Sequence, residues 1–226
     1  MTKLTRDQVL QLIASARGRG EKPELLGPNL NETERRRTKL GSSNISESEH
    51  RRANLSGAEL YGMNLSGMDL HGVDLIGADL GEANLCQANL SGANLYQANL
   101  MGANLTEVNI SQAKLMQANL SQANLSQANL SQANLGTANL SQANLTGANF
   151  RQTSLRGANL RGANLSGTDL TSADLRNTDL RQTNLKQANL KQANLSGANL
   201  HGAKYDKATI WPVNFHPAEI GAVRED

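Results

Sequence analysis

An apolar residue occupies every fifth position of the chain from Leu55 to Leu200 without a break. Of these 30 positions, 28 are leucine, and the exceptions are Ile110 and Phe150. Two residues before each apolar position lies a small or compact residue, usually alanine, and a polar residue, usually asparagine, lies between the two. The repeating unit is therefore Ala-Asn-Leu followed by two variable residues, and the spacing predicts that Tyr205 and Ile210 continue the series.

A period of five fits neither regular element, because a helix needs apolar positions about 3.6 residues apart and a strand about 2 residues apart. Within one unit, alanine and leucine are two residues apart, so both face one side of a short extended segment. The chain must then turn before the next unit, and four such turns close a square. With coils stacked at about the 4.8 Å spacing of β-structure, residues 51–210 predict about 8 coils with leucine piled on leucine inside.

This tandem of Ala-(Asn/Asp)-Leu units resembles the pentapeptide-repeat family, which is abundant in cyanobacteria. The similarity covers residues 51–210 of the 226 residues. It implies an all-β solenoid with the fold of a right-handed quadrilateral β-helix, and the handedness follows from the resemblance alone. Family members of known role are non-enzymatic: some protect DNA gyrase by mimicking DNA, and others act in cyanobacterial development through protein contacts.

The two ends depart from the repeat, as expected of a solenoid, whose terminal coils need caps. We expect a capping helix and linker over residues 1–27, a degenerate first coil or loop over 28–52, the β-helix over 53–210, and a C-terminal cap and tail over 211–226. The apolar residues expected to form the caps are Val9, Leu12, Ile13, Trp211 and Phe215. The alternative for the N-terminal helix, a short amphipathic segment, is contact with a partner or a second copy.

Outward side chains 20 residues apart should stack on one corner of the solenoid. This spacing predicts an exposed apolar stripe, which usually marks a contact site. The candidate interaction surface consists of Ile76, Tyr96, Met116, Tyr61 and Met101. The alternative is that these are isolated surface hydrophobic residues of the ordinary kind.

The same outward columns become basic in the later units. Residues 151–205 carry eight Lys or Arg and three Asp, whereas residues 51–150 carry three basic and six acidic residues. The candidate basic patch consists of Arg156, Arg161, Arg176 and Arg181. It predicts either a solvated mixed-charge surface or a site for an acidic partner or anion. Specific nucleic-acid binding is not expected, because no aromatic residue lies among these arginines to stack on bases.

The sequence contains no recognisable catalytic constellation. Its four histidines are scattered and lack metal-ligand spacing with each other or with Cys86, the single cysteine. No phosphate-binding loop, dinucleotide fingerprint or nucleophile elbow is present. We therefore expect no enzymatic activity, no cofactor and no metal. There is also no apolar run long enough to span a membrane and no signal-peptide pattern, which predicts a cytoplasmic protein.

These observations favour a non-enzymatic scaffold that presents polar columns to a protein partner. A more specific form of this hypothesis is a regulatory role in a cyanobacterium. We expect a monomer or a weak homodimer. The alternative is a DNA mimic that modulates DNA gyrase, but the net charge of +2 and the asparagine-rich faces disfavour it. Binding to ice or another flat surface would need regular threonine columns, and only scattered threonines such as Thr106 and Thr146 occur.

Overall fold

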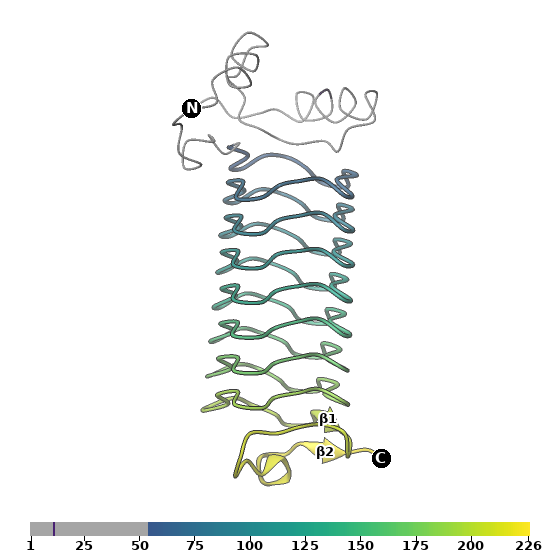
Figure 1. Ribbon diagram of the computed structural model, residues 1–226, viewed down its shortest axis with the longest axis vertical. Helices are drawn as coiled ribbons and strands as arrows, with labels where there is room; N and C mark the ends of the chain where they lie inside the picture. Colours follow the sequence, from purple (N-terminus) through teal and green to yellow (C-terminus); the bar gives the residue numbers. More distant parts are fainter. Residues whose placement is uncertain (1–10, 12–53) are drawn as a thin grey trace, which may run out of the picture.

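Residues 54–226 wind into a stack of coils that ends in a short folded-back segment (Figure 1). The structure is a computed structural model that describes Gln11 and residues 54–226. The predicted capping helix with Val9, Leu12 and Ile13, and the predicted degenerate coil, lie outside these residues, apart from Gln11, which is helical. Within the described part of the chain, no helix has the length and apolar character needed to cross a membrane.

Each corner of a coil is a tight turn with the same geometry throughout the stack. The alanine N–H donates to the carbonyl of the leucine three residues earlier, at 3.2 Å from Ala123 to Leu120. We call the two residues between them the first and second corner positions. In every turn from Gly57 to Gly202, the residue at the second corner position has φ between +53° and +71°, whether it is glycine or not. Since the first corner position has no positive φ, this is the pattern of a type II turn.

Successive coils are joined by a parallel hydrogen-bond ladder. The polar residue of each unit forms a bridge with the residue 20 positions later, as Asn99 does with Asn119 and Asn119 with Asn139. The following leucine donates its N–H to the carbonyl of that later residue, at 2.7 Å from Leu100 to Asn119. A turn follows each bridge, so no long strand forms in the coils. The ladder still gives the backbone polar groups of the coils their hydrogen-bond partners.

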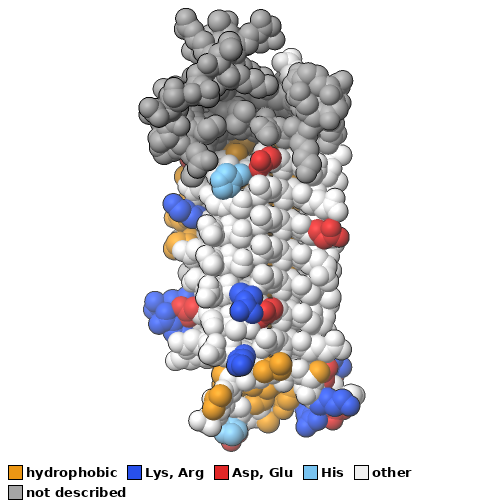
Figure 2. Space-filling model, viewed as in Figure 1, with side chains coloured by type: hydrophobic (Ala, Val, Ile, Leu, Met, Phe, Trp, Pro, Cys, Tyr) orange, Lys and Arg blue, Asp and Glu red, His pale blue; other side chains and the backbone are white. Residues whose placement is uncertain are grey.

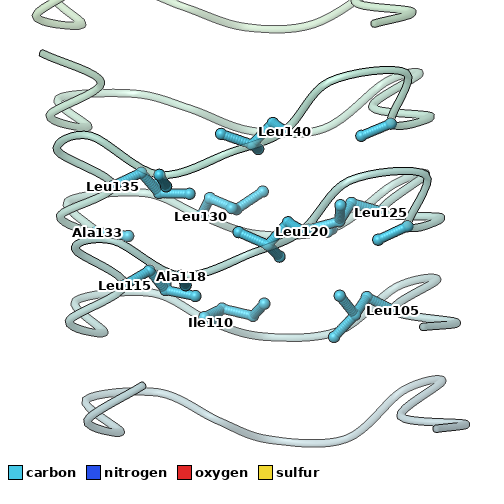
Figure 3. Packing of buried hydrophobic residues seen from close by; sticks show 14 of the residues in the cluster. Leu105, Ile110, Leu115, Ala118, Leu120, Leu125, Leu130, Ala133, Leu135 and Leu140 are labelled. Carbon is cyan, nitrogen blue, oxygen red and sulfur yellow. The ribbon is translucent and has the colours of Figure 1, made fainter. Parts of the chain in front are cut away.

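The leucine and alanine positions of all units together fill the interior of the stack. Leu120 and Leu125 have no exposed surface, and Phe150 takes a leucine position without becoming exposed. Ala118 and Ala133, each 1% exposed, fill the space beside them. Figure 3 shows such side chains from successive coils pointing into one common interior. Each fully buried leucine contributes about 1.5–3 kcal/mol, which explains a stable core with few aromatic residues.

Asparagine stabilises both the corner and the contact between coils. The Asn119 Oδ1 accepts the N–H of Ser121 at 3.2 Å, which is a local turn bond typical of asparagine. The Asn119 Nδ2 donates to Asn99 Oδ1 of the preceding coil at 3.3 Å. In the same way, Asn139 donates to Asn119 at 3.2 Å. This outward asparagine column is therefore an amide ladder that runs along the stack.

The five-residue spacing is broken by one extra residue near the C-terminal end. Asn189 bridges Ile210, although the spacing of 20 residues would pair it with Thr209. Thr209 takes the inner small position and is 9% exposed. Ile210 takes the outer polar position and is 50% exposed, so the prediction that it continues the inward series is wrong. Trp211 then follows in the position that leucine holds elsewhere.

The chain closes by folding back under the last coil. Strand β1 spans Lys204–Tyr205, the 3-10 helix η2 spans Pro217–Ile220, and strand β2 spans Val223–Arg224 and pairs in parallel with β1. Trp211 stacks on Phe215 with 5.3 Å between ring centroids, and its ring meets that of Tyr205 edge-on at 5.5 Å. All three rings pack against the buried leucines, at the end of the core.

Candidate protein-interaction face

One side of the square is bounded by two unusual corners, and we call it the Asn99 face. Coil 1 is taken as residues 55–74, coil 2 as 75–94, and later coils follow at intervals of 20. The outward polar column of the Asn99 face contains Glu59, Asp79, Asn99, Asn119, Asn139, Asn159, Asp179 and Asn199. The first corner positions on one side, the Tyr96 corner, are Ser56, Ile76, Tyr96, Met116, Gly136, Arg156, Arg176 and Ser196. Those on the other side, the Met101 corner, are Tyr61, Gly81, Met101, Ser121, Ser141, Arg161, Arg181 and His201.

Exposed hydrophobic side chains of the coils gather on these two corners. Within residues 54–205, the strongly exposed large hydrophobic residues are Tyr61, Ile76, Met101 and Met116, each 36% to 45% exposed. Tyr96 is half-buried, and its hydroxyl donates to Gln117 Oε1 at 3.0 Å. The structure therefore places the five residues of the candidate interaction surface along the edges of a single face, over coils 1 to 4.

Glycines stand on these corners in the coils that follow Tyr61 and Met116, and the first of them makes room for the Tyr61 ring. Gly81 and Gly136 occupy first corner positions, where φ is not positive and the backbone does not require glycine. A Cβ on Gly81 would lie 3.0 Å from Tyr61 Cδ2 and 3.1 Å from Asn99 Nδ2, which is closer than carbon atoms normally approach. A Cβ on Gly136 would lie 3.8 Å from Met116 Cγ, an ordinary contact. The Tyr61 ring thus lies along the corner, against Gly81.

The four arginines of the candidate basic patch fall into two different electrostatic classes. Arg176 donates through Nε and Nη2 to Asp174 at 2.8 and 2.6 Å. Arg181 makes the same pair of bonds to Asp179 at 2.8 and 2.6 Å. These hydrogen bonds hold the pKa of both aspartates below the ordinary value of 3.8. The charges of these two arginines are therefore largely matched by carboxylates two residues earlier.

Arg156 and Arg161, both in coil 6, form no ion pair with any residue in the described range 54–226. Both side chains are exposed, and Arg161 Nε donates to Gln182 Oε1 at 3.4 Å. The residues two positions earlier are Ser154 and Asn159, which carry no charge. Arg156 and Arg161 also lower the pKa of Asp174 and Asp179 by Coulombic attraction, but less than the hydrogen-bonded Arg176 and Arg181 do. Because neither has a carboxylate bonded to it, we call the positive charge of these two arginines unmatched.

The opposite end of the same face is acidic. Glu59 and Asp79 stand in its outward column, and Glu82 follows Gly81 at the Met101 corner. The hydrogen bond with the Glu82 carboxylate is the largest cause that raises the pKa of the Tyr61 hydroxyl above 10.0. Along the stack, the Asn99 face has acidic residues in coils 1 and 2, apolar corners over coils 1 to 4, and basic residues in coil 6.

The remaining surface of the coils is more uniform. Figure 2 shows a side of the stack on which most side chains are neither hydrophobic nor charged, with hydrophobic and basic ones visible along one edge. At the corner that holds Gln127 and Gly147, a shallow open depression reaches Lys186, whose Nζ pairs with Glu225 at 3.2 Å. The free Cys86 lies half-buried at the same corner column. In the described part of the chain, no three His, Cys, Asp or Glu side chains cluster in a way that could hold a metal ion.

Two features of the Asn99 face could have been found in the sequence from departures from the repeat pattern. The glycines at positions 81 and 136 stand in the first corner position, whereas the repeat places glycine in the second. The residues two positions before each arginine, aspartate in two cases and uncharged in the other two, distinguish the matched charges from the unmatched ones.

The coils, the ladder and the inward leucines define a four-sided parallel β-helix, which is the architecture of pentapeptide repeats. The family model for pentapeptide repeats matches the chain in 8 copies, within residues 36–72, 51–86, 69–106, 83–122, 103–142, 138–171 and 173–204. The chain therefore belongs to the pentapeptide-repeat family, and the solved structures it resembles imply a right-handed quadrilateral β-helix.

Several solved structures are similar to this chain. HetL, a pentapeptide repeat protein involved in heterocyst differentiation regulation from the cyanobacterium Nostoc sp. strain PCC 7120, is 33% identical over 67% of this chain and 80% of its own, with a TM-score of 0.35. Another pentapeptide repeat protein from Nostoc PCC 7120 is 36% identical over 52% of this chain and 84% of its own, with a TM-score of 0.25.

QnrB1, a plasmid-mediated fluoroquinolone resistance protein, is 23% identical over 69% of this chain and 83% of its own, with a TM-score of 0.50. At this identity the likeness concerns the fold alone. No match was found among curated proteins.

Proposed function

We propose that this protein is a non-enzymatic scaffold that binds a protein partner through the Asn99 face. The observation that carries the proposal is that the strongly exposed large hydrophobic residues of the described coils all stand on the two corners bounding this face. Scattered surface hydrophobic residues need no explanation, but contiguous ones usually mark a contact site. Here they follow two neighbouring corners over four successive coils.

The packing of the exposed side chains supports the same proposal. Tyr61 lies against Gly81, and Tyr96 is held by a hydrogen bond to Gln117. A side chain that is already held in place loses less conformational entropy when a partner binds it. Tyrosine and methionine are also enriched at protein interfaces relative to other surfaces.

The charges of the Asn99 face argue against the alternative of a DNA mimic. A mimic of the DNA backbone needs an extended acidic surface, but the acidic residues of this face are limited to its first two coils and Asp179, which pairs with Arg181. The unmatched Arg156 and Arg161 present the opposite charge. We expect no inhibition or protection of gyrase in a supercoiling assay.

A site-specific cross-linking experiment tests the proposal. A photoreactive residue is placed at position 96, or at position 111 on a different corner as the matched control, and each protein is irradiated in lysate of the source organism. We expect a discrete adduct from position 96 that is absent from position 111 and is lost when Ile76→Ser and Met116→Ser are added. No adduct, or the same adducts from both positions, would contradict the proposal.

A further inference from the structure

The backbone of the Asn99 face is already fully used by the ladder, which restricts what a partner can offer. The Asn99 N–H donates to Ala78 at 2.9 Å, and the Leu100 N–H donates to the carbonyl of Asn119 at 2.7 Å. A strand could therefore not extend this face by pairing with its backbone. A partner must bind through side chains and satisfy its own backbone groups, which an α-helix does internally.

The order of chemical types along the face sets the shape of the partner. Apolar side chains lie on coils 1 to 4, from Tyr61 to Met116, and the unmatched Arg156 and Arg161 lie on coil 6. Between them, coil 5 presents Gly136, Asn139 and Ser141 together with the exposed Thr137 and Gln142, none of which is charged or large and apolar. At about 4.8 Å per coil, the five steps from coil 1 to coil 6 cover about 24 Å, which an α-helix of about 16 residues spans at 1.5 Å per residue.

We propose that the Asn99 face binds an amphipathic α-helix of a partner protein, laid along the stack, with its apolar stripe over coils 1 to 4 and carboxylates over Arg156 and Arg161. This inference rests on the proposed function and makes it specific. Three coil spacings, about 14 Å, separate Tyr96 and Met101 of coil 3 from the arginines of coil 6. The partner's carboxylates should therefore follow the apolar anchor that contacts coil 3 by about 10 residues.

Charge complementarity selects an acidic rather than a neutral or basic helix end. Arg176 and Arg181 already meet Asp174 and Asp179, so they attract a further carboxylate only weakly. Arg156 and Arg161 are exposed without an ion-pair partner in the described residues, and they flank the same face. Complementary charges at the rim of an interface mainly set orientation and specificity, which here fixes the direction of the helix along the stack.

The test uses three designed helical peptides of about 20 residues that share one leucine stripe and differ only in two residues of one terminal turn, which are Glu, Gln or Lys. Binding is measured by fluorescence anisotropy with the whole protein. We expect the Glu peptide to bind about 10-fold more tightly than the Lys peptide, with a difference that shrinks at high salt. The variant Arg156→Glu with Arg161→Glu should reverse this order.

Two variants serve as controls for this reversal. Lys191→Glu changes an exposed cation on a different corner and should leave the order of the peptides unchanged. Ile76→Ser with Met116→Ser should weaken all three peptides alike, because it removes the apolar contact and keeps both arginines. The circular dichroism spectrum of each variant should match that of the unmodified protein.

Three results would overturn the inference: no binding of any peptide, equal binding of the Glu and Lys peptides, or the same reversal with Lys191→Glu. Vesicles of anionic phospholipid that bind through Arg156 and Arg161, while the peptides do not bind, would also contradict the inference. The partner would then be a membrane surface and not a helix. If cross-linking from position 96 still gives a specific adduct while the peptides fail, the helix inference is wrong and the proposed function stands.

Discussion

The two corner positions of a turn are adjacent in sequence but differ in the sign of φ, and this difference can be tested by substitution. At one corner away from the Asn99 face, Gln132 has φ of +59°, whereas Ser131 has no positive φ. Both residues can be replaced in turn by glycine, alanine and valine. If the coil imposes the left-handed conformation whatever the residue, the stability order of these substitutions should invert between the two positions.

The expected magnitudes follow from the backbone. An L-residue in the left-handed region costs about 1–2 kcal/mol, and glycine avoids this cost but loses about 0.5–1 kcal/mol through its greater freedom in the unfolded chain. We therefore expect Gln132→Gly to be about 0.5–1 kcal/mol more stable than Gln132→Ala, and Gln132→Val to be the least stable because β-branched residues tolerate positive φ poorly. The side-chain bond from Gln112 to Gln132 is long, at 3.5 Å, and exposed, so its loss adds little.

At Ser131 the order should be the opposite, with Ser131→Gly about 0.5–1 kcal/mol less stable than Ser131→Ala. The free energy of unfolding is measured by urea denaturation with far-UV circular dichroism. Fluorescence of Trp211 alone would report the C-terminal end, and the coils of a solenoid are coupled mainly to their neighbours. A glycine variant that is the less stable one at both positions would refute the reasoning.

Three further predictions concern single groups. The arginines lower the pKa values of Asp174 and Asp179, so these carboxylates stabilise the fold fully above the ordinary pKa of 3.8. This stabilisation is lost as the pH falls through their lower pKa values in the folded protein. Replacing both by asparagine should therefore flatten the dependence of stability on pH below about pH 4, measured by thermal unfolding at a series of pH values. Glu82→Gln should lower the pKa of Tyr61 toward 10.0, observed by ultraviolet absorbance titration, and an unchanged titration would mean that the carboxylate does not set this pKa. The buried Trp211 Nε1 has no hydrogen-bond partner in the described residues, so Trp211→Phe should cost less than about 1 kcal/mol, whereas Trp211→Ala, which removes the stacked ring, should cost about 3 kcal/mol in denaturation experiments.

The main part of the fold could be predicted from the sequence because a five-residue period allows only one simple way to bury leucine. The same period hid the irregular end. Ile210 is apolar and stands at the expected spacing, yet one extra residue turns it outward and places Thr209 inside. A single inserted residue cannot be recognised from the apolar positions when the shifted residues also fit the repeat, as Thr209 fits the small position and Trp211 the leucine position.

The sequence predicts which residues of the candidate site share a corner, because residues 20 positions apart stack in one column. Spacing by 20 residues brings Ile76, Tyr96 and Met116 onto one corner, as the structure does. Spacing alone does not show which arginines keep an unmatched charge, because Arg156 and Arg176 occupy equivalent positions of the repeat. The sequence marks that difference only through the residue two positions earlier, which is Asp174 before Arg176 and Ser154 before Arg156. The structure shows the result, namely the two bonds from Arg176 to Asp174.

The location of the non-consensus residues is itself an argument about function. The inward positions of this fold are fixed by packing, and the outward polar positions are favoured as asparagine by the amide ladder, but the first corner position is constrained by neither. Serine and threonine are common there on the corners that do not bound the Asn99 face. If no partner acted on the protein, large hydrophobic residues should appear at the first corner positions of all four corners at similar rates. Their concentration on two corners, beside glycines that the backbone does not require, is the pattern expected when one face contacts another molecule.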